Sequence, residues 1–340
     1  MSEMSGMSGF KRTVLIALAG FAAACGNSGG APVRVTVPPG ASMRTAADSL
    51  AKSGVIRSAR MFRAYAFIKG NDRDIKPGTY LLPRQSSYSS VLEDLRAGKG
   101  LVHIVTIPEG FSLSQIVPML ATKLDVPVDS VEAAVRDSAL LRHFDLSTST
   151  LEGYLFPDTY IFPAGTTAHS AVNTMVHRFD QIWKPEWSER LDSLHMSRNE
   201  VVTLASIVEK EARVPSERPV IAAVYLNRLH HDELLQADPT VQYVLGKHVA
   251  RVYYKDLEID SPYNTYKHKG LPPGPIASPG RPSLEAALYP ADVGYEYFVA
   301  FPDGHHEFRG DLAAHERAKL AARKAWDSVA TRRGDSSRPK

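Results

Sequence analysis

The chain has 340 residues, of which 44% are hydrophobic and 23% are charged, and its formal net charge at pH 7 is +3. This length suits two domains, or one domain with a small attached module, and the hydrophobic share is ordinary for a globular protein with a buried core. Because acids and bases are mixed along the chain and nearly balance, the composition does not predict a nucleic-acid partner.

Residues 1–25 have the layout of an export signal. Two basic residues, Lys11 and Arg12, precede an apolar stretch at 13–24 that is shorter than the roughly 20 residues of a membrane-spanning helix. Small residues then lead to Cys25, as in a bacterial lipobox, although an alanine stands where leucine is usual. We therefore expect lipidation at Cys25, with an uncleaved signal anchor or a plain secretory signal as alternatives. A lipid or signal anchor places the remaining chain on the periplasmic or extracytoplasmic side of a cell membrane.

Residues 26–32, GNSGGAP, predict a flexible linker, and residues 33–100 predict a small βααβ module with one added helix. The first strand of the module ends at a Pro-Pro-Gly turn, and its first two helices end near Gly54 and Gly70. A module of this size is too small to hold a deep catalytic cleft, so we expect it to bind a ligand and not to catalyse a reaction.

Residues 101–150 predict a strand, a turn and a helix, followed by a polar and partly helical connection. Residues 151–330 predict a larger α+β domain that begins with an aromatic- and proline-rich segment. We expect its helices near 167–183, 199–212, 216–230 and 283–288, a strand at 295–301, and a final helix from about 311 to 331. The segments LLQADPTVQYVLG and SPYNTYKHKGLPPGPIASPGRPS are expected to be loops, and residues 331–340 a disordered tail.

The helix expected at 199–212 is apolar around most of its circumference and ends with two glutamates. Asn199 is expected to be its N-cap. At about 100° per residue, Glu209 and Glu211 fall on opposite borders of the apolar face, so one helix cannot aim both into the same cleft. Either glutamate is explained by solvent exposure or by an ion pair with Arg213 or Arg218, which follow closely in the chain.

The functional alternative for one of these glutamates is a carboxyl group in an apolar cleft wall. Desolvation there raises the pKa of the carboxyl and keeps it protonated, so that it can act as a general acid. The helical periodicity does not choose between the two glutamates.

Six segments, in this order, resemble the endolytic murein transglycosylase family, also called MltG or YceG-like. They are LEGYLFPDTY, LASIVEKEA, VYLNRL, LQADPTVQY, YNTY followed by GLPPGPIASPG, and HHEFRGDLAAHERA. The resemblance covers 151–320, and the module at 33–100 is similar to the LysM-like subdomain of the same family. The family usually starts with a longer membrane-spanning helix, so this chain departs from it in its expected anchor.

The resemblance implies an endolytic lytic transglycosylase that cleaves the β-1,4 bond between N-acetylmuramic acid and N-acetylglucosamine inside nascent peptidoglycan strands. The products carry 1,6-anhydro ends, and the cleavage limits strand elongation. In the family, the second glutamate of the EKE segment is the catalytic acid, which is Glu211 here, and Glu209 then has a structural role. The reaction needs no cofactor and no metal, and none of the histidines has the spacing of a helical zinc motif.

Polar residues of the aromatic segment and of the two loops are the expected glycan contacts: Glu152, Asp158, Gln236, Asp238, Asn264 and Tyr266. Asp238 has an alternative role, because Asp-Pro is a common helix N-cap followed by proline at the first helical position. Glu152 and Asp158 either line the cleft or tie down their own segment, and the sequence favours neither role.

The implied partners are peptidoglycan glycan strands and cell-wall synthases such as penicillin-binding proteins, with the membrane contacted through the N-terminal anchor. From the residues alone, two other functions stay open. A non-catalytic scaffold would bind glycan strands and recruit cell-wall enzymes. A hydrolytic muramidase would need a second carboxylate opposite Glu211, for which Asp238 is the best candidate.

Overall fold

The structure is a computed structural model that describes residues 30–70, 75–246 and 252–332. Cys25 and the expected export signal lie outside the described residues, as does the tail after 332. The chain divides into two compact units, and the division falls between Gly100 and Leu101. Within the described ranges, no helix is long and apolar enough to cross a membrane.

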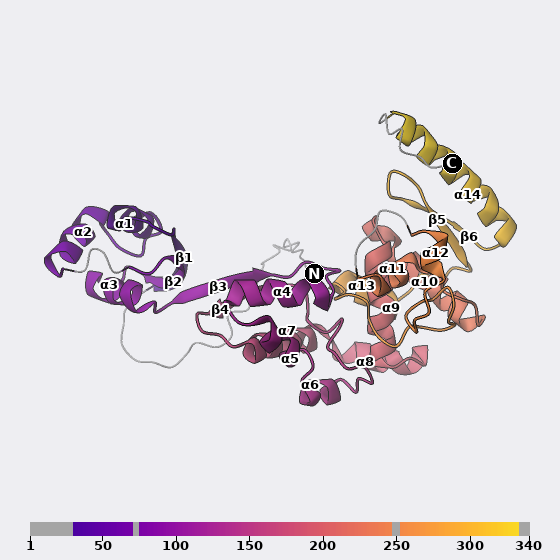
Figure 1. The fold of residues 1–340 in the computed structure, drawn as a ribbon, viewed down its shortest axis with the longest axis horizontal. Helices are drawn as coiled ribbons and strands as arrows, with labels where there is room; N and C mark the ends of the chain where they lie inside the picture. Colours follow the sequence, from indigo (N-terminus) through magenta and orange to yellow (C-terminus); the bar gives the residue numbers. More distant parts are fainter. Residues whose placement is uncertain (1–29, 71–74, 247–251, 333–340) are drawn as a thin grey trace, which may run out of the picture. The chain divides into compact units, whose positions relative to one another are not determined.

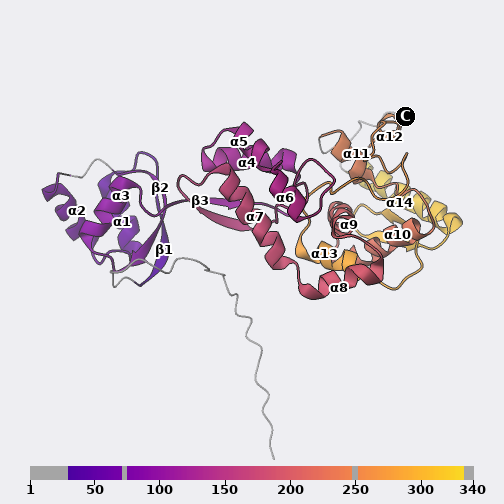
Figure 2. The same cartoon turned by 90° about the horizontal axis from the view of Figure 1, so that it is seen from below.

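The first unit gathers three helices on one side of an antiparallel strand pair (Figure 1 and Figure 2). Its elements are, in order, β1 (Gly30–Val37), α1 (Met43–Lys52), α2 (Ala59–Ile68), β2 (Gly78–Arg84) and α3 (Tyr88–Ala97). Strands β1 and β2 pair with Val35 opposite Tyr80. Each helix follows a serine whose hydroxyl accepts a backbone N–H, which satisfies one of the free donors of a helix start. The order of elements is the predicted one.

The second unit begins with another antiparallel strand pair and the helices that follow it. Strand β3 (Leu101–Thr106) pairs with β4 (Thr159–Pro163), with Ile104 opposite Ile161. Between these strands in the chain lie α4 (Leu113–Leu124), α5 (Val128–Ala134) and α6 (Ser138–His143), and α7 (Ala168–Ile182) follows β4. Helix α4 packs against β3, α5 and α7.

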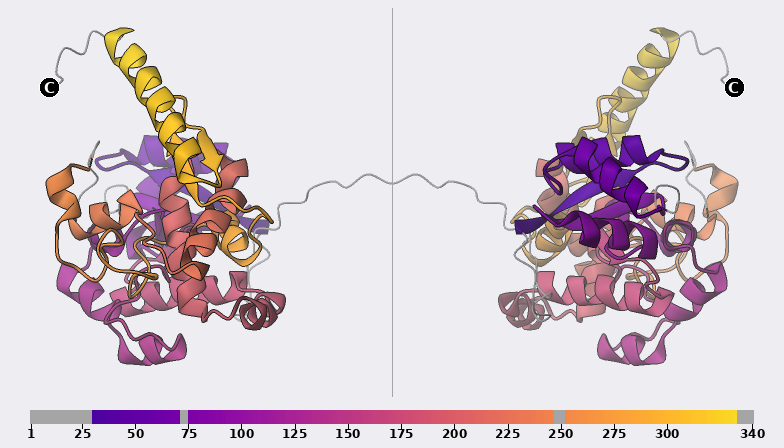
Figure 3. Two further views of the ribbon diagram at one scale, coloured as in Figure 1. Left: turned by 90° about the vertical axis from the view of Figure 1, so that its right-hand side faces the viewer. Right: turned by 90° about the vertical axis from the view of Figure 1, so that its left-hand side faces the viewer.

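The other elements of this unit follow α7 in the chain and include the long buried helix α9 (Arg198–Glu211). Besides α9, they are α8 (Pro185–Leu194), η1 (Pro215–Glu217), α10 (Arg218–His230), α11 (Asp238–Val244), α12 (Tyr254–Leu257), α13 (Arg281–Leu288), β5 (Tyr297–Ala300), β6 (His306–Arg309) and α14 (Leu312–Arg332). Helix α9 contacts α8, α10, α11 and α13. Helix α14 packs on the β5–β6 hairpin and extends away from the rest of this unit (Figure 3).

Helix α9 is buried on every side between Val201 and Val208, so its polar stripe does not face solvent. Thr203 and Ser206 on that stripe are 1% and 0% exposed. The Ser206 hydroxyl donates to the Thr203 carbonyl and accepts the backbone N–H of Ile276, which ties the helix to the Pro/Gly-rich loop. The core of the unit therefore surrounds α9 up to the turn that carries the two glutamates.

The predicted α+β class is confirmed, but some local predictions are wrong. Helix α11 lies in a segment predicted to be a loop, and α8, α12 and β6 lie where no element is predicted. Helices α8 and α11 carry proline in the first turn, where the missing N–H has no intrahelical partner in any case, so proline begins these helices. The N-cap of α9 is Ser197 and not Asn199, because Ser197 and Glu200 form a reciprocal capping box.

Candidate functional site

Glu211 is the last residue of α9, and its half-buried side chain faces α10. The hydroxyl of Tyr225 on α10 donates a hydrogen bond to Oε1 of Glu211 at 2.9 Å. Tyr225 is 1% exposed, and its ring lies edge-on to Phe298 of β5 at 5.7 Å. The buried ring fixes the position of the hydroxyl, and the hydroxyl in turn holds the carboxyl of Glu211.

Burial raises the pKa of Glu211 from its ordinary 4.5 to about 7. The hydrogen bond from Tyr225 and the charge of Arg213 oppose this rise, whereas the negative charge of Asp238 adds to it. The C-terminal end of a helix also carries partial negative charge, which disfavours a carboxylate at this position. Glu211 therefore keeps a large protonated fraction near neutral pH, as a general acid requires.

Glu209 points to the other side of α9, toward the N-terminus of α13. Its Oε2 accepts the backbone N–H of Gly280 at 3.1 Å and the hydroxyl of Ser283 at 2.7 Å. Its Oε1 lies 3.6 Å from Nη2 of Arg218. Glu109 also approaches this region, and burial together with the charge of Glu209 raises its pKa. The prediction that the two glutamates face opposite sides of the helix is confirmed.

Asp238 begins helix α11 as its first residue, and its exposed side chain faces Tyr266. The Tyr266 hydroxyl donates to Oδ1 of Asp238 at 2.5 Å. The N-cap interpretation of Asp238 is wrong, because Ala237 occupies that position and no side chain caps the helix. The structure thus brings Asp238 and Tyr266 together, and the charge of Asp238 is close enough to raise the pKa of Glu211.

Gln236 lies just before this pair in a backbone conformation that non-glycine residues rarely adopt, with φ of 52°. Its Oε1 accepts a hydrogen bond from Nη2 of Arg228 at 3.1 Å, and its backbone N–H donates to the carbonyl of Thr265. Arg228 is 9% exposed and also donates to the carbonyls of Leu234 and Glu296. These bonds hold the exposed side chain of Gln236 in a fixed place.

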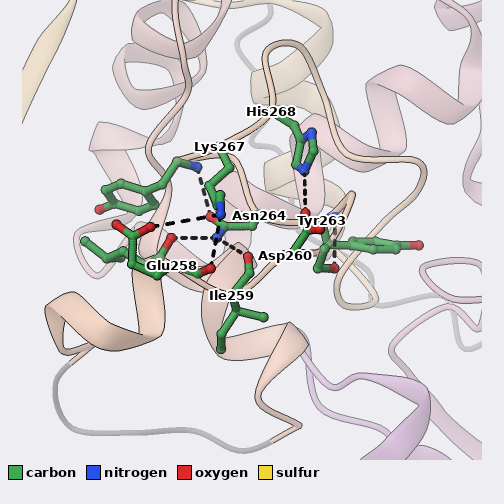
Figure 4. Close-up of polar contacts among 10 residues, drawn as sticks. Glu258, Ile259, Asp260, Tyr263, Asn264, Lys267 and His268 are labelled. Carbon is green, nitrogen blue, oxygen red and sulfur yellow. Dashed lines mark hydrogen bonds and ion pairs between the residues drawn. The ribbon is translucent and has the colours of Figure 1, made fainter.

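Asn264 is completely buried and lies at the centre of a hydrogen-bonded loop (Figure 4). Its Nδ2 donates to the carbonyls of Leu257 and Ile259, both at 2.8 Å. Its Oδ1 accepts the backbone N–H of Tyr266 at 3.0 Å. The structure therefore places Asn264 as a support for Tyr266, because both amide hydrogens are already used inside the loop.

Glu152 is 5% exposed and sits at the N-terminus of α4. Its carboxyl accepts the backbone N–H of Leu113 at 3.0 Å and the hydroxyl of Tyr243 at 3.3 Å. Burial raises its pKa to about 7, against the effect of these hydrogen bonds.

The next residue, Gly153, has φ of +84°, and a Cβ there would lie 2.4 Å from Cβ of Pro275. Glycine at this position thus lets the aromatic segment meet the Pro/Gly-rich loop.

Asp158 ties down its own segment. Its Oδ2 accepts a hydrogen bond from Nε of Arg178 on α7 at 2.8 Å, and its Oδ1 accepts the backbone N–H of Thr159. Its carbonyl accepts the N–H of Ile107, next to the β3–β4 pair. Of the two roles left open for Asp158, the structure supports the anchoring one.

A cavity of about 1010 Å³ lies between α4, α5 and α11. Its polar and aromatic lining includes Gln115, Glu152, Lys210, Gln242, Tyr243 and Tyr263. The rings of Tyr243 and Tyr263 are 4.9 Å apart. Glu211 is not part of the lining, but Lys210 and Pro239, the chain neighbours of Glu211 and Asp238, are. The cavity therefore lies beside the segments that carry Glu211 and Asp238, but neither of these two side chains lines it.

Sequence reasoning missed Tyr225 and Arg228, which hold Glu211 and Gln236. Both lie in VYLNRL, where two long side chains with polar ends interrupt an otherwise buried helix, and this pattern is the signal that was available. Among the residues that the structure describes, no group of three or more His, Cys, Asp or Glu side chains is arranged to hold a metal ion. His306 instead pairs with Glu217 at 2.7 Å.

Comparison with known proteins points to one family. Residues 35–321 match the YceG-like family. The endolytic murein transglycosylase of Bacillus subtilis strain 168 is 36% identical over 306 residues, which are 84% of this chain and 84% of that protein. The endolytic murein transglycosylase of Streptococcus pneumoniae serotype 2 (strain D39) is 31% identical over 327 residues, which are 85% of this chain and 59% of that protein.

A solved structure is also similar. The crystal structure of a YceG-like protein from Listeria monocytogenes superposes with a TM-score of 0.62 at 34% sequence identity. The match covers 84% of this chain and 98% of that chain.

Proposed function

Because this chain belongs to the YceG-like family, we propose that it is a lytic murein transglycosylase that cleaves peptidoglycan glycan strands internally. The observation that carries the proposal is the carboxyl of Glu211. It ends a buried helix, is held by a buried tyrosine, and has a pKa raised to about 7. A non-catalytic binding protein has no use for a desolvated acid in this position.

Glu211 in its protonated form donates its proton to the oxygen that links N-acetylmuramic acid to N-acetylglucosamine. The bond from C1 to that oxygen breaks, and positive charge develops on the muramic ring, where the carboxylate of Asp238 is a nearby negative charge. The C6 hydroxyl of the same sugar then attacks C1, and Glu211, now a carboxylate, takes the hydroxyl proton. The products are a 1,6-anhydro end and a free hydroxyl, and Glu211 regains its starting form without water as a reactant.

A pKa near neutrality suits this cycle because one group serves first as acid and then as base. A carboxyl with its ordinary pKa of 4.5 would be almost fully ionised at pH 7, and the first step would then lack its proton. The elevated pKa of Glu211 is a consequence of burial, so the packing around this one side chain supplies the acid by excluding water from it.

The cavity beside Lys210 and Pro239 is the proposed glycan cleft, since its volume and its paired tyrosines suit a chain of sugar rings. Among the expected sugar contacts, Glu152 lines this cavity. We assign further direct contacts to Gln236, Asp238 and Tyr266, which lie outside its lining. Asn264 and Asp158 act on the glycan through the loops that they hold. The free amide nitrogen of Gln236 is a suitable donor to an acetamido carbonyl.

In the same proposal, the LysM-like module at 33–100 binds the glycan strand, and residues 151–330 form the domain that cleaves it. Residues 101–150 connect the module to this domain. Residues 1–25 anchor the protein on the extracytoplasmic side of a cell membrane, with lipidation at Cys25. Cleavage of nascent strands there limits their elongation, which makes cell-wall synthases the natural partners.

A hydrolytic muramidase is the second candidate, and the proximity of the Asp238 carboxylate to Glu211 is the observation that favours it. Mass spectrometry of products from un-crosslinked glycan strands separates the two reactions, because hydrolysis adds one water and transglycosylation adds none. We expect anhydro ends, and products that carry an added water would establish the hydrolase instead.

A further inference from the structure

Tyr225 is the hydrogen-bond donor that the structure gives to Glu211, and nothing in the sequence motif assigns it a role. Its ring is buried on the side of α10 that packs against α9, and it contacts Phe298 edge-on with an interplanar angle of 88°. Its hydroxyl lies 2.9 Å from Oε1 of Glu211. A rigidly held ring thus presents one O–H group to one of the two carboxyl oxygens.

A carboxylic acid carries its proton on one oxygen, and the other oxygen acts as the acceptor. Because Oε1 of Glu211 accepts the hydrogen of Tyr225, the acidic proton belongs on Oε2. We propose that Tyr225 is a positioning residue that keeps the proton of Glu211 on Oε2, the oxygen that delivers it to the glycosidic bond. This role rests on the proposed function of Glu211.

The same bond supports Glu211 through the rest of the cycle. When Glu211 has given up its proton, the Tyr225 hydroxyl donates to a charged oxygen, and such a bond is roughly twice as strong as a neutral one. The hydroxyl keeps its own proton throughout, because burial and the charge of Glu211 raise the pKa of Tyr225 well above its ordinary value. Tyr225 therefore favours the carboxylate, and it lowers the pKa of Glu211.

Other charged groups also face Glu211, and they set the background for this effect. Asp238 on α11 raises the pKa of Glu211, and Arg213, which follows α9, lowers it. Tyr266 reaches the site through its bond to Asp238. On the α13 side of the helix, Arg218 pairs with Glu209 and not with Glu211.

The test is the substitution Tyr225→Phe, with kcat/KM measured against pH on un-crosslinked glycan strands. Removal of the hydroxyl raises the pKa of Glu211, so the pH at which activity falls on the basic side should move upward by up to about one unit. The maximal rate should fall about tenfold, because Glu211 loses its fixed orientation. Tyr154→Phe is the matched control, since the buried Tyr154 donates to Oδ1 of Asn199 at the other end of α9, and it should leave that pH unchanged.

An unchanged basic limb in Tyr225→Phe would overturn the positioning role even if the rate falls, because phenylalanine keeps the buried ring and removes only the hydroxyl that lowers the pKa of Glu211. Cleavage by Glu211→Gln would instead overturn the proposed function, so the two failures are distinguishable. If Tyr225→Phe does not fold, ¹³C-tyrosine NMR of the unaltered protein replaces it. The Cζ resonance of Tyr225 should titrate with the midpoint of Glu211, and a flat resonance would overturn the role.

Discussion

Glu209 and Glu211, both in the C-terminal turn of α9, carry the same carboxyl group but lie in opposite surroundings. On one side, the carboxylate of Glu209 meets the guanidinium of Arg218, the Ser283 hydroxyl and the backbone N–H of Gly280, the N-cap of α13. On the other side, Glu211 accepts one hydrogen bond, from the neutral hydroxyl of Tyr225, and the negative charge of Asp238 and the positive charge of Arg213 act on it in opposite directions. The two residues are separated in sequence by Lys210 alone.

The difference shows that the surroundings, and not the residue type, decide which glutamate can act as an acid. A helix N-terminus and an arginine both attract a carboxylate, so Glu209 joins α9 to α13. Glu211 lies at the negative end of its own helix in a desolvated place, so protonation is favoured there. Each side can be changed by single substitutions.

The largest expected effect is on activity. Glu211→Gln should reduce cleavage of glycan strands by roughly 10²- to 10⁴-fold, because the amide has no proton to donate. Glu209→Gln is the matched control and should keep most of the activity. Mass spectrometry of released anhydro fragments measures both. The opposite ranking of the two variants would show that the acid is assigned to the wrong side of the helix.

The next effect is on the pH dependence of stability. The folded pKa of Glu211, about 7, exceeds its ordinary 4.5, so the native state binds more protons between these values and loses stability as pH rises through about 7. Glu211→Gln removes this loss and should be more stable than the parent protein by about 1–3 kcal/mol at pH 8, with little difference at pH 4. Urea unfolding followed by tryptophan fluorescence measures this, since all three tryptophans lie after residue 100. Equal differences at both pH values would contradict burial as the cause.

On the other side of the helix, Glu209→Gln should destabilise the second unit by about 1–2 kcal/mol at pH 7. The amide loses the charge that Arg218 and the N-terminus of α13 stabilise, although its oxygen can still accept one hydrogen bond. The same fluorescence assay applies. Unaltered stability would mean that this carboxylate contributes nothing to the α9–α13 contact.

The smallest expected effect concerns Asp238. Asp238→Asn removes the negative charge that raises the pKa of Glu211 but keeps an oxygen to accept the Tyr266 hydroxyl. The basic limb of the pH profile should move downward, by less than about one pH unit, which is opposite in sign to Tyr225→Phe. A shift upward, or none, would mean that the two carboxyl groups do not interact.

Local sequence signals predicted part of the regular structure but missed α8, α11, α12 and β6. Serine caps, glycine stops and apolar periodicity indicated the strand and helix order of residues 33–100 and the helix that carries the glutamates. They failed where two local signals compete. Ser197 and Asn199 both suit an N-cap, and the capping box with Glu200 decides for Ser197. At Asp238-Pro239, the proline begins the helix one residue earlier than an aspartate cap would allow.

The sequence predicted some residues of the candidate site correctly and others not. Gln236, Asp238 and Tyr266 do come together. The amide of Asn264, however, makes its hydrogen bonds inside its own loop, and Asp158 is paired with Arg178. A sequence shows that a residue is polar, but it does not show whether the donors and acceptors of that residue are already satisfied by groups far along the chain.

Helix geometry is local, so the sequence was sufficient to place Glu209 and Glu211 on opposite faces of one helix. The charge state of each glutamate is not local. Glu211 meets Tyr225, 14 residues away, whereas Glu209 meets Gly280, 71 residues away. Desolvation and nearby charge set the pKa of a carboxyl group. Packing between distant segments therefore decides that the Glu211 carboxyl is desolvated and that the Glu209 carboxylate lies beside a cation.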